Sequence, residues 1–323
     1  MRRAVIAGLI LLLVIVAGVI ALRARPAPLA SPRVVVTIAP LRGLVEPMLP
    51  QGEPVGVVIP PGLTVHGYEP TPADRAMLER ADLVVCVGLG LEGSLDPVLN
   101  ELDKRGKLVR FAEVVGIAPG VGAEHVHEDD EPDADEEHHH HGVDPHLWLD
   151  PKLCEQLVDA VHERLDARAV GTEERARLTM AWEGMRARIA EVRALYAAAL
   201  APYAGVSLVT HHAAWGRLLD PFGITVAAVI RPIEGAEPTP GELAAARQAI
   251  EQAGAVGVII EPQFDASWPR RIAQEAGVPL GVLDPLGDGD WFKMMRTNLD
   301  ELVRVLSAAR AHAAAPAPED TQP

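Results

Sequence analysis

The chain has 323 residues, which is room for about two domains of ordinary size, and 49% of its residues are apolar, enough for a large core. Its formal net charge is -16, with 45 acidic residues against 29 basic ones. An acidic chain without a basic stripe is a poor partner for nucleic acid phosphates, so cations are the more natural ligands.

The N-terminal segment is an apolar run from Ala4 to Leu22 that follows two arginines and is closed by Arg23 and Arg25. A positive start before an apolar stretch is typical of an export signal, and the run is also long enough to span a bilayer. We therefore predict that residues 1–32 are a signal peptide or an uncleaved membrane anchor, followed by a tether. In both cases the rest of the chain lies outside the cytoplasm.

A first α/β lobe is predicted over residues 33–166. Continuous apolar runs of the kind found in buried parallel strands alternate with helical segments. The helix that begins near Thr71 has that residue as a plausible cap and Pro72 in its first turn. The runs that predict strands are RVVVTIAP, PVGVVIPP, DLVVCVGLG and KLVRFAEV.

The two cysteines, Cys86 and Cys154, belong to this lobe. Exported proteins often pair such residues in a disulfide. However, Cys86 lies within an apolar run and Cys154 near the start of a helix. We predict two thiols that pack separately, with a disulfide as the alternative.

Residues 120–142 form an insertion rich in histidine and acidic residues. It has few apolar side chains, so it cannot bury enough surface to become ordered. Histidine-rich tracts usually bind metal, and we interpret this loop as a set of weak accessory metal sites; a merely solvated polar loop is the alternative. The histidines concerned are His125, His127, His138, His139, His140 and His141.

A long helix is predicted within residues 167–202. Apolar residues recur there at alternating steps of four and three, which marks one face of a helix, and Thr172 is a candidate for its cap. At 1.5 Å per residue the helix would run about 40 Å, too long for a crossover within one small sheet. We interpret it as a rigid link between two lobes. The apolar positions are Leu178, Trp182, Met185, Ile189, Val192 and Tyr196.

The alternation of strands and helices resumes over residues 203–313, which we predict to be a second α/β lobe, and residues 314–323 look disordered. The expected strands are GVSLVTHH, ITVAAVI, AVGVIIEP and PLGVLDP. The predicted fold is therefore α/β, with two lobes, each a mainly parallel sheet flanked by helices, joined by one long rigid helix.

Candidate ligand residues follow strands in both lobes, where open α/β sheets bind their ligands. They are His66, His146, His212 with its neighbour His211, and Asp284. Singly, each has a plain structural explanation, such as an exposed loop histidine or a turn aspartate. Together, three imidazoles and a carboxylate are a full tetrahedral set for Zn²⁺, which would be held in the cleft between the lobes.

Five motifs carry a resemblance to a known family. VHGYEPTPAD, DPHLWLDP, THHAAWGRLLDPFG, IEPQFD and VLDPLG resemble the motifs of zinc-binding solute-binding proteins of bacterial ABC importers, the ZnuA-like branch (cluster A-I) of the TroA superfamily. The resemblance covers residues 33–313. It implies an extracytoplasmic, periplasmic receptor, monomeric and not an enzyme, that carries Zn²⁺ to a permease and its ATPase.

Carried over by motif, the metal ligands are His66, His146 and His212, with Asp284 completing the shell or standing close to it. A histidine at the third position favours zinc over manganese, because manganese-binding relatives tend to place a carboxylate there. Zinc-binding members often have a disulfide in the second lobe, and this chain has no cysteine there.

The roles of residues around these ligands are left open by the sequence. Glu261 could orient a ligand histidine or be a plain structural acid. We interpret Asp150 as a helix cap and Asp144 as a turn residue. The aromatic residues Tyr68, Trp148 and Trp215 are expected to pack around the cleft.

Three other functions remain as alternatives. One is a manganese receptor of the same superfamily, and another is a metal-dependent surface adhesin, which a membrane anchor would suit. A zinc hydrolase is disfavoured, because the sequence has no HExxH-like motif and four protein ligands would leave no open position on the metal.

Overall fold

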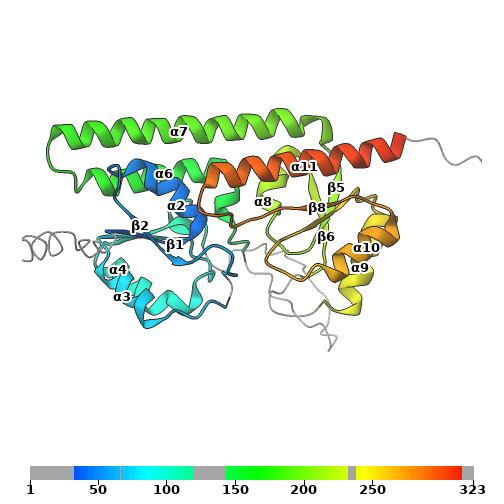
Figure 1. Cartoon of the computed structure of the whole chain (residues 1–323), viewed down its shortest axis with the longest axis horizontal. Helices are drawn as coiled ribbons and strands as arrows, with labels where there is room; N and C mark the ends of the chain where they lie inside the picture. Colours follow the sequence, from blue (N-terminus) through cyan, green and yellow to red (C-terminus); the bar gives the residue numbers. More distant parts are fainter. Residues whose placement is uncertain (1–32, 66, 119–142, 232–237, 315–323) are drawn as a thin grey trace, which may run out of the picture.

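The computed structural model describes residues 33–65, 67–118, 143–231 and 238–314. They form two α/β lobes side by side, with a long helix running over both (Figure 1). The predicted signal or anchor segment, the histidine-rich loop and the C-terminal tail lie outside the described residues. Within the described ranges, no helix is long and apolar enough to cross a membrane.

The first lobe contains a four-stranded parallel sheet in the order β2-β1-β3-β4. The strands β1 and β3 are buried along their whole length, as continuous apolar runs predict for central strands covered on both faces. The run KLVRFAEV is only half strand, because α5 begins at Phe111. The strands are β1 (Val34–Ile38), β2 (Val55–Ile59), β3 (Leu83–Cys86) and β4 (Leu108–Arg110).

Helices cover both faces of this sheet, with α3 and α4 on one side and α2 and α6 on the other (Figure 1). Thr71 caps α3 as predicted. Its side chain accepts a hydrogen bond from the Asp74 backbone N–H, and the Asp74 carboxylate accepts one from the Thr71 backbone N–H. Asp150 caps α6, also as predicted, by accepting from the Lys152 backbone N–H at 2.7 Å. The helices are α2 (Ala39–Val45), α3 (Pro72–Arg80), α4 (Asp96–Lys104), α5 (Phe111–Val114) and α6 (Pro151–Asp166).

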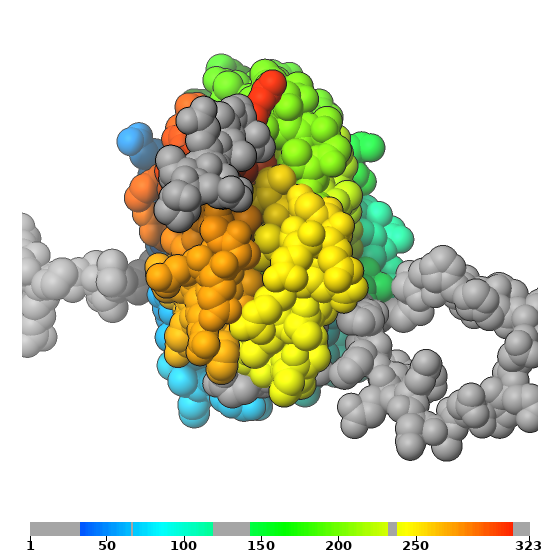
Figure 2. Space-filling view, turned by 90° about the vertical axis from the view of Figure 1, so that its right-hand side faces the viewer, coloured from blue at the N-terminus to red at the C-terminus, as the bar shows by residue number. Residues whose placement is uncertain are grey.

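The second lobe repeats the topology with the order β6-β5-β7-β8, again all parallel. Helices α9 and α10 lie side by side on its outer surface (Figure 2). The edge strand β6 is partly exposed, whereas β7 is buried throughout. The elements are β5 (Ser207–Thr210), α8 (Gly216–Leu219), β6 (Thr225–Val229), α9 (Pro240–Glu251), β7 (Val258–Ile260), α10 (Ser267–Ala276), β8 (Leu280–Val282) and α11 (Trp291–Ala314).

The predicted linking helix is α7 (Thr172–Leu200), about 43 Å long, which packs on α6 in the first lobe and on α11 toward the second. Its buried residues include Leu178, Met185, Ile189, Val192 and Tyr196, and Trp182 is half-buried against the core, so the predicted apolar face is confirmed. The predicted cap is wrong. Gly171 is the N-cap residue, Thr172 is the first residue of the helix, and no side chain makes a capping hydrogen bond. The Glu174 carboxylate accepts from the Val170 N–H, just before the helix, at 2.8 Å.

The lobes are also joined by contacts that the single-helix prediction did not include. Helix α2 approaches the start of α11 so closely that a Cβ on Gly43 would clash with the Trp291 backbone nitrogen. The Trp291 indole donates to the Trp148 carbonyl at 2.8 Å, and the Trp148 indole donates to the Pro285 carbonyl at 2.6 Å. Both lobes are therefore bound to each other directly beside the cleft.

The two cysteines are free and fully buried, which confirms that they pack separately. Burial raises the pKa of both thiols well above the ordinary value, because the thiolate would lose its hydration. The Cys154 thiol donates to the Trp148 carbonyl at 3.3 Å. Both residues are therefore inert parts of the core of the first lobe.

Candidate metal site

His146 comes from the first lobe, directly before the 3₁₀ turn Leu147–Leu149 that leads into α6. It is 4% exposed. Asp144 accepts from its backbone N–H at 2.9 Å, and the same carboxylate oxygen lies 2.8 Å from the ring Nδ1. Asp144 is thus a turn residue, as predicted, and in addition it orients the imidazole. The carboxylate thus contacts Nδ1 of a ring that lines the cavity between the lobes.

Arg217 holds Asp144 from the other lobe. This residue of α8 donates to the Asp144 carbonyl through Nε at 2.9 Å and Nη2 at 2.6 Å, and Nε lies 3.5 Å from the carboxylate. Asp220 stands nearby, and burial together with repulsion from Asp144 raises the pKa of its carboxyl. The guanidinium is therefore the positive charge that keeps the His146 loop in place.

His212 comes from the second lobe, just beyond the end of β5, and is 5% exposed. Its ring stands nearly perpendicular to that of His146, with 5.0 Å between the centroids. Its Nδ1 lies 3.4 Å from the Glu261 carboxylate, and that carboxylate accepts from the Trp215 indole at 2.9 Å. Glu261, which is only 2% exposed, thus contacts the ring as an orienting acid would.

His211 is buried beside His212 but does not line the same cavity. Its ring packs edge-on against Phe264, with 5.6 Å between the centroids. Burial lowers the pKa of its imidazole, because the charged form would lose its hydration. His211 is therefore part of the packing around the site.

A cavity of about 20 Å³ lies between the two imidazoles. Such a space holds one water molecule or one ion, and it is too small for an organic ligand. His66 lies outside the described residues, although Thr64 and Val65, which precede it in the chain, are in the cavity wall. The other lining residues are His146, Trp148, His212, Glu261, Gln263, Phe264, Pro285 and Leu286.

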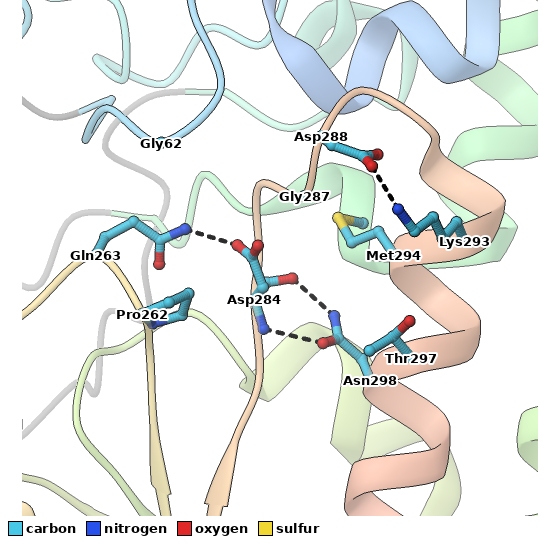
Figure 3. A pocket seen from close by; sticks show the side chains of 10 residues that line it. All are labelled: Gly62, Pro262, Gln263, Asp284, Gly287, Asp288, Lys293, Met294, Thr297 and Asn298. Carbon is cyan, nitrogen blue, oxygen red and sulfur yellow. Dashed lines mark hydrogen bonds and ion pairs between the residues drawn. The ribbon is translucent and has the colours of Figure 1, made fainter.

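Asp284 follows β8 and lies in a neighbouring, larger cavity of about 350 Å³ (Figure 3). Its Oδ1 accepts from the Gln263 side chain at 2.6 Å and from the Leu286 backbone N–H at 3.0 Å. Among the described residues, no group of three or more His, Cys, Asp or Glu side chains is arranged to hold a metal. The role of Asp284 as a ligand therefore stays a prediction, and so do the roles of His66 and of the accessory histidines, which lie outside the described ranges.

The sequence patterns led to His146 and His212 but not to Arg217 or Gln263. Both missed residues lie inside quoted motifs, THHAAWGRLLDPFG and IEPQFD. Nothing in their residue type distinguishes them from solvated surface residues. Their contacts with Asp144 and Asp284 depend on how the lobes and loops meet.

Comparison with known families identifies the chain. The profile of the family ZnuA, described as zinc-uptake complex component A, periplasmic, matches residues 34–305. The chain belongs to this family. It is 27% identical to the high-affinity zinc uptake system protein ZnuA of Yersinia pestis over 83% of this chain and 87% of that protein. It is 25% identical to the zinc-binding protein AdcA of Streptococcus pyogenes over 84% of its own length, but it spans only 55% of AdcA.

Solved structures share the ZnuA-type fold. A crystal structure of ZnuA has a TM-score of 0.69 at 23% identity, covering 84% of this chain and 98% of that one. The periplasmic zinc-binding protein TroA of Treponema pallidum has a TM-score of 0.71 at 22% identity, covering 86% and 99%. The protein FpvC of Pseudomonas aeruginosa, in complex with Mn²⁺, has a TM-score of 0.68 at 24% identity over the same shares. At these identities the likeness shows a shared fold. It does not show which metal this chain binds.

Proposed function

We propose that this protein is an extracytoplasmic receptor that binds Zn²⁺ and delivers it to an ABC importer. The observation that carries the proposal is the pair His146 and His212, two buried imidazoles that meet across a cavity the size of one ion. Each ring has its Nδ1 beside a carboxylate, as metal-binding histidines usually do. Membership in the zinc-uptake family supports the same cargo.

The proposed ligands are His66, His146 and His212, with Asp284 joining the shell or standing beside it. Imidazole nitrogen suits zinc, whereas manganese and magnesium prefer oxygen ligands. An acid next to an imidazole ring fixes which ring nitrogen carries the proton. It also makes the other ring nitrogen a stronger metal ligand. A site of this kind binds a cation tightly without needing a net negative charge at the metal.

We further propose that the protein catalyses no reaction and acts as a monomer, tethered through its N-terminal segment or released by its cleavage. Its partners would be a permease and that permease's ATPase. The working units would be residues 33–166, the linking segment 167–202 and residues 203–313. Sedimentation of the purified protein and fractionation of membranes test the oligomeric state and the tether.

Metal titration tests the site directly. Protein stripped of metal should bind one Zn²⁺ tightly in a competition titration against a chromogenic chelator. His146→Ala and His212→Ala should each weaken binding by at least about 100-fold, since changes to orienting residues alone cost 10–100-fold. His162→Gln is a matched control, because His162 stacks on Trp182 between α6 and α7, with 4.6 Å between the ring centroids. Equal affinity in the control and the two alanine variants would refute the site.

The histidine-rich loop is proposed to capture zinc and pass it inward, or to sense a surplus. Tethered ligands reach effective concentrations in the millimolar range, so zinc bound weakly by the loop would be available at high local concentration for transfer to the tight site. Deleting residues 123–141 should lower the total zinc stoichiometry and leave the tight site intact. Unchanged stoichiometry, together with unchanged uptake under zinc starvation, would show that the loop has no such role.

A further inference from the structure

Gln263 stands at the border between the histidine cavity and the larger cavity that contains Asp284. It follows β7 by three residues and contributes to the walls of both spaces. Its side-chain Nε2 donates to Asp284 Oδ1 at 2.6 Å, a charge-assisted hydrogen bond (Figure 3). Gln263 is therefore the residue that links the wall of the histidine cavity to the Asp284 carboxylate.

The main chain of Asp284 is held independently of this bond. Asn298 of α11, 1% exposed, accepts from the Asp284 backbone N–H at 2.9 Å and donates to its carbonyl at 2.8 Å. With the backbone clamped, only the direction of the carboxylate is adjustable. The donors that set this direction are the Gln263 amide and the Leu286 N–H, both on the same oxygen.

The other end of the Gln263 amide shows which contact orients it. Its Oε1 is buried and has no hydrogen-bond partner in the described part of the chain. A buried carbonyl oxygen without a partner is unfavourable. The side chain thus keeps its orientation because Nε2 is bound to Asp284.

We propose that Gln263 determines metal selectivity by keeping the Asp284 carboxylate engaged outside the histidine cavity. The two hydrogen bonds to Oδ1 fix the direction of the carboxylate, which lines the larger cavity and not the histidine cavity, so the site presents imidazole nitrogen to the ion. Zinc accepts such a site, whereas manganese, which prefers carboxylate oxygen, is disfavoured. This inference rests on the proposed function and deepens it, because it assigns the discrimination between the two metals to one residue.

The test replaces Gln263 by leucine, which has a similar size and cannot hydrogen-bond. The full chain, freed of metal, is titrated separately with Zn²⁺ and Mn²⁺ in competition with a chelator. Gln263→Leu should strengthen Mn²⁺ binding by about tenfold and change Zn²⁺ binding by less than about threefold, so the ratio of the two affinities falls. Gln248→Leu is the control, because Gln248 bonds Gln252 on the exposed face of α9.

A double substitution shows whether the effect passes through Asp284. In an Asp284→Asn background, Gln263→Leu should leave the ratio of zinc to manganese affinity unchanged. An unchanged ratio in the single variant, or an equal shift in both backgrounds, overturns the inference. If Gln263→Leu fails to fold by circular dichroism, Gln263→Asn, one methylene shorter, serves in its place. Absence of a tight zinc site in the unmodified protein would instead refute the proposed function.

Discussion

The two lobes have the same strand order, and each has a buried glutamate beside the carboxyl end of a central strand, yet they use that acid differently. In the first lobe, Glu92 accepts from the Thr37 hydroxyl at 2.7 Å and from the Val87 and Gly88 backbone N–H groups at 2.8 and 2.9 Å. In the second lobe, Glu261 accepts from the Trp215 indole and faces the His212 ring.

The difference shows that topology provides a place for a buried acid, while its donors decide its role. Glu92 accepts hydrogen bonds from backbone and hydroxyl groups of its own lobe. It therefore links β1 to the loop that follows β3 and has a structural role. Burial raises the pKa of its carboxyl despite these bonds. Glu261 contacts a ring that lines the cavity, so the buried acid of the second lobe serves the candidate site.

Replacing Glu92 by alanine should have the largest effect. The Val87 and Gly88 N–H groups and the Thr37 hydroxyl would lose their acceptor inside the protein. At about 1–3 kcal/mol for each unsatisfied buried group, we expect the free energy of unfolding to fall by about 3 kcal/mol or more. Urea denaturation of the metal-free protein measures this.

Glu113→Ala is the control in the same lobe, because this carboxylate is 64% exposed and its Oε1 lies 3.0 Å from Arg110 Nε, within one helical turn. Its effect should stay within about 0.5 kcal/mol. A Glu92 variant as stable as this control would show that the first lobe does not depend on its buried acid.

Replacing Glu261 by glutamine should lower the affinity for Zn²⁺ and change the free energy of unfolding little. The amide oxygen can still accept from Trp215, but the charge beside the His212 ring is lost. We expect Zn²⁺ affinity to fall by about 10–100-fold, equivalent to about 1.4–2.8 kcal/mol, as for other acids that orient metal-binding histidines. A competition titration measures the affinity, and undiminished binding would make Glu261 a purely structural acid.

Arg217→Gln should have a smaller effect on the same affinity. Asp144 would lose its partner from α8 and hold His146 less firmly, and we expect about 3–10-fold weaker Zn²⁺ binding. Arg186→Gln is the matched control, since that arginine pairs with Asp159 on the α6–α7 face, away from the cleft. Equal affinities in the two variants would contradict a role for Arg217 in placing the first-lobe histidine.

The smallest expected effect is a pH dependence of opposite sign in the two lobes. Burial lowers the pKa of His211, so below its ordinary value of 6.5 the unfolded chain takes up a proton that the folded chain resists. His211 therefore favours folding less as pH falls. Glu92, whose pKa is raised, favours folding less as pH rises above its ordinary value of 4.5.

Thermal unfolding of metal-free protein at about pH 7.5 and 5.5 tests the histidine, whose ordinary pKa lies between them. His211→Gln should reduce the loss of melting temperature on acidification. An unaltered loss would show that other groups carry the acid sensitivity.

Local sequence patterns were enough to predict the helices and strands of the fold and some residues of the candidate site. Continuous apolar runs predicted the strands, and the helical periodicity predicted α7, because burial on a sheet or along one helix face leaves a repeating trace in the residues. His146 and His212 could be singled out because parallel sheets bind ligands where strands end. The predicted cap of α7 was wrong, because the helix begins one residue earlier than a Thr172 cap requires, with Gly171 as the N-cap and no side-chain cap hydrogen bond.

The amino-acid order fixes which residues lie at strand ends, because alternation of strand and helix is a local property of the chain. It does not reveal which of these residues meet. The approach of α2 to Trp291, the hold of Arg217 on Asp144 and the bond between Gln263 and Asp284 all join segments far apart in the chain. The first two contacts depend on the packing of one lobe against the other, and the third on how two loops of the second lobe meet, and no periodicity in the sequence records that packing.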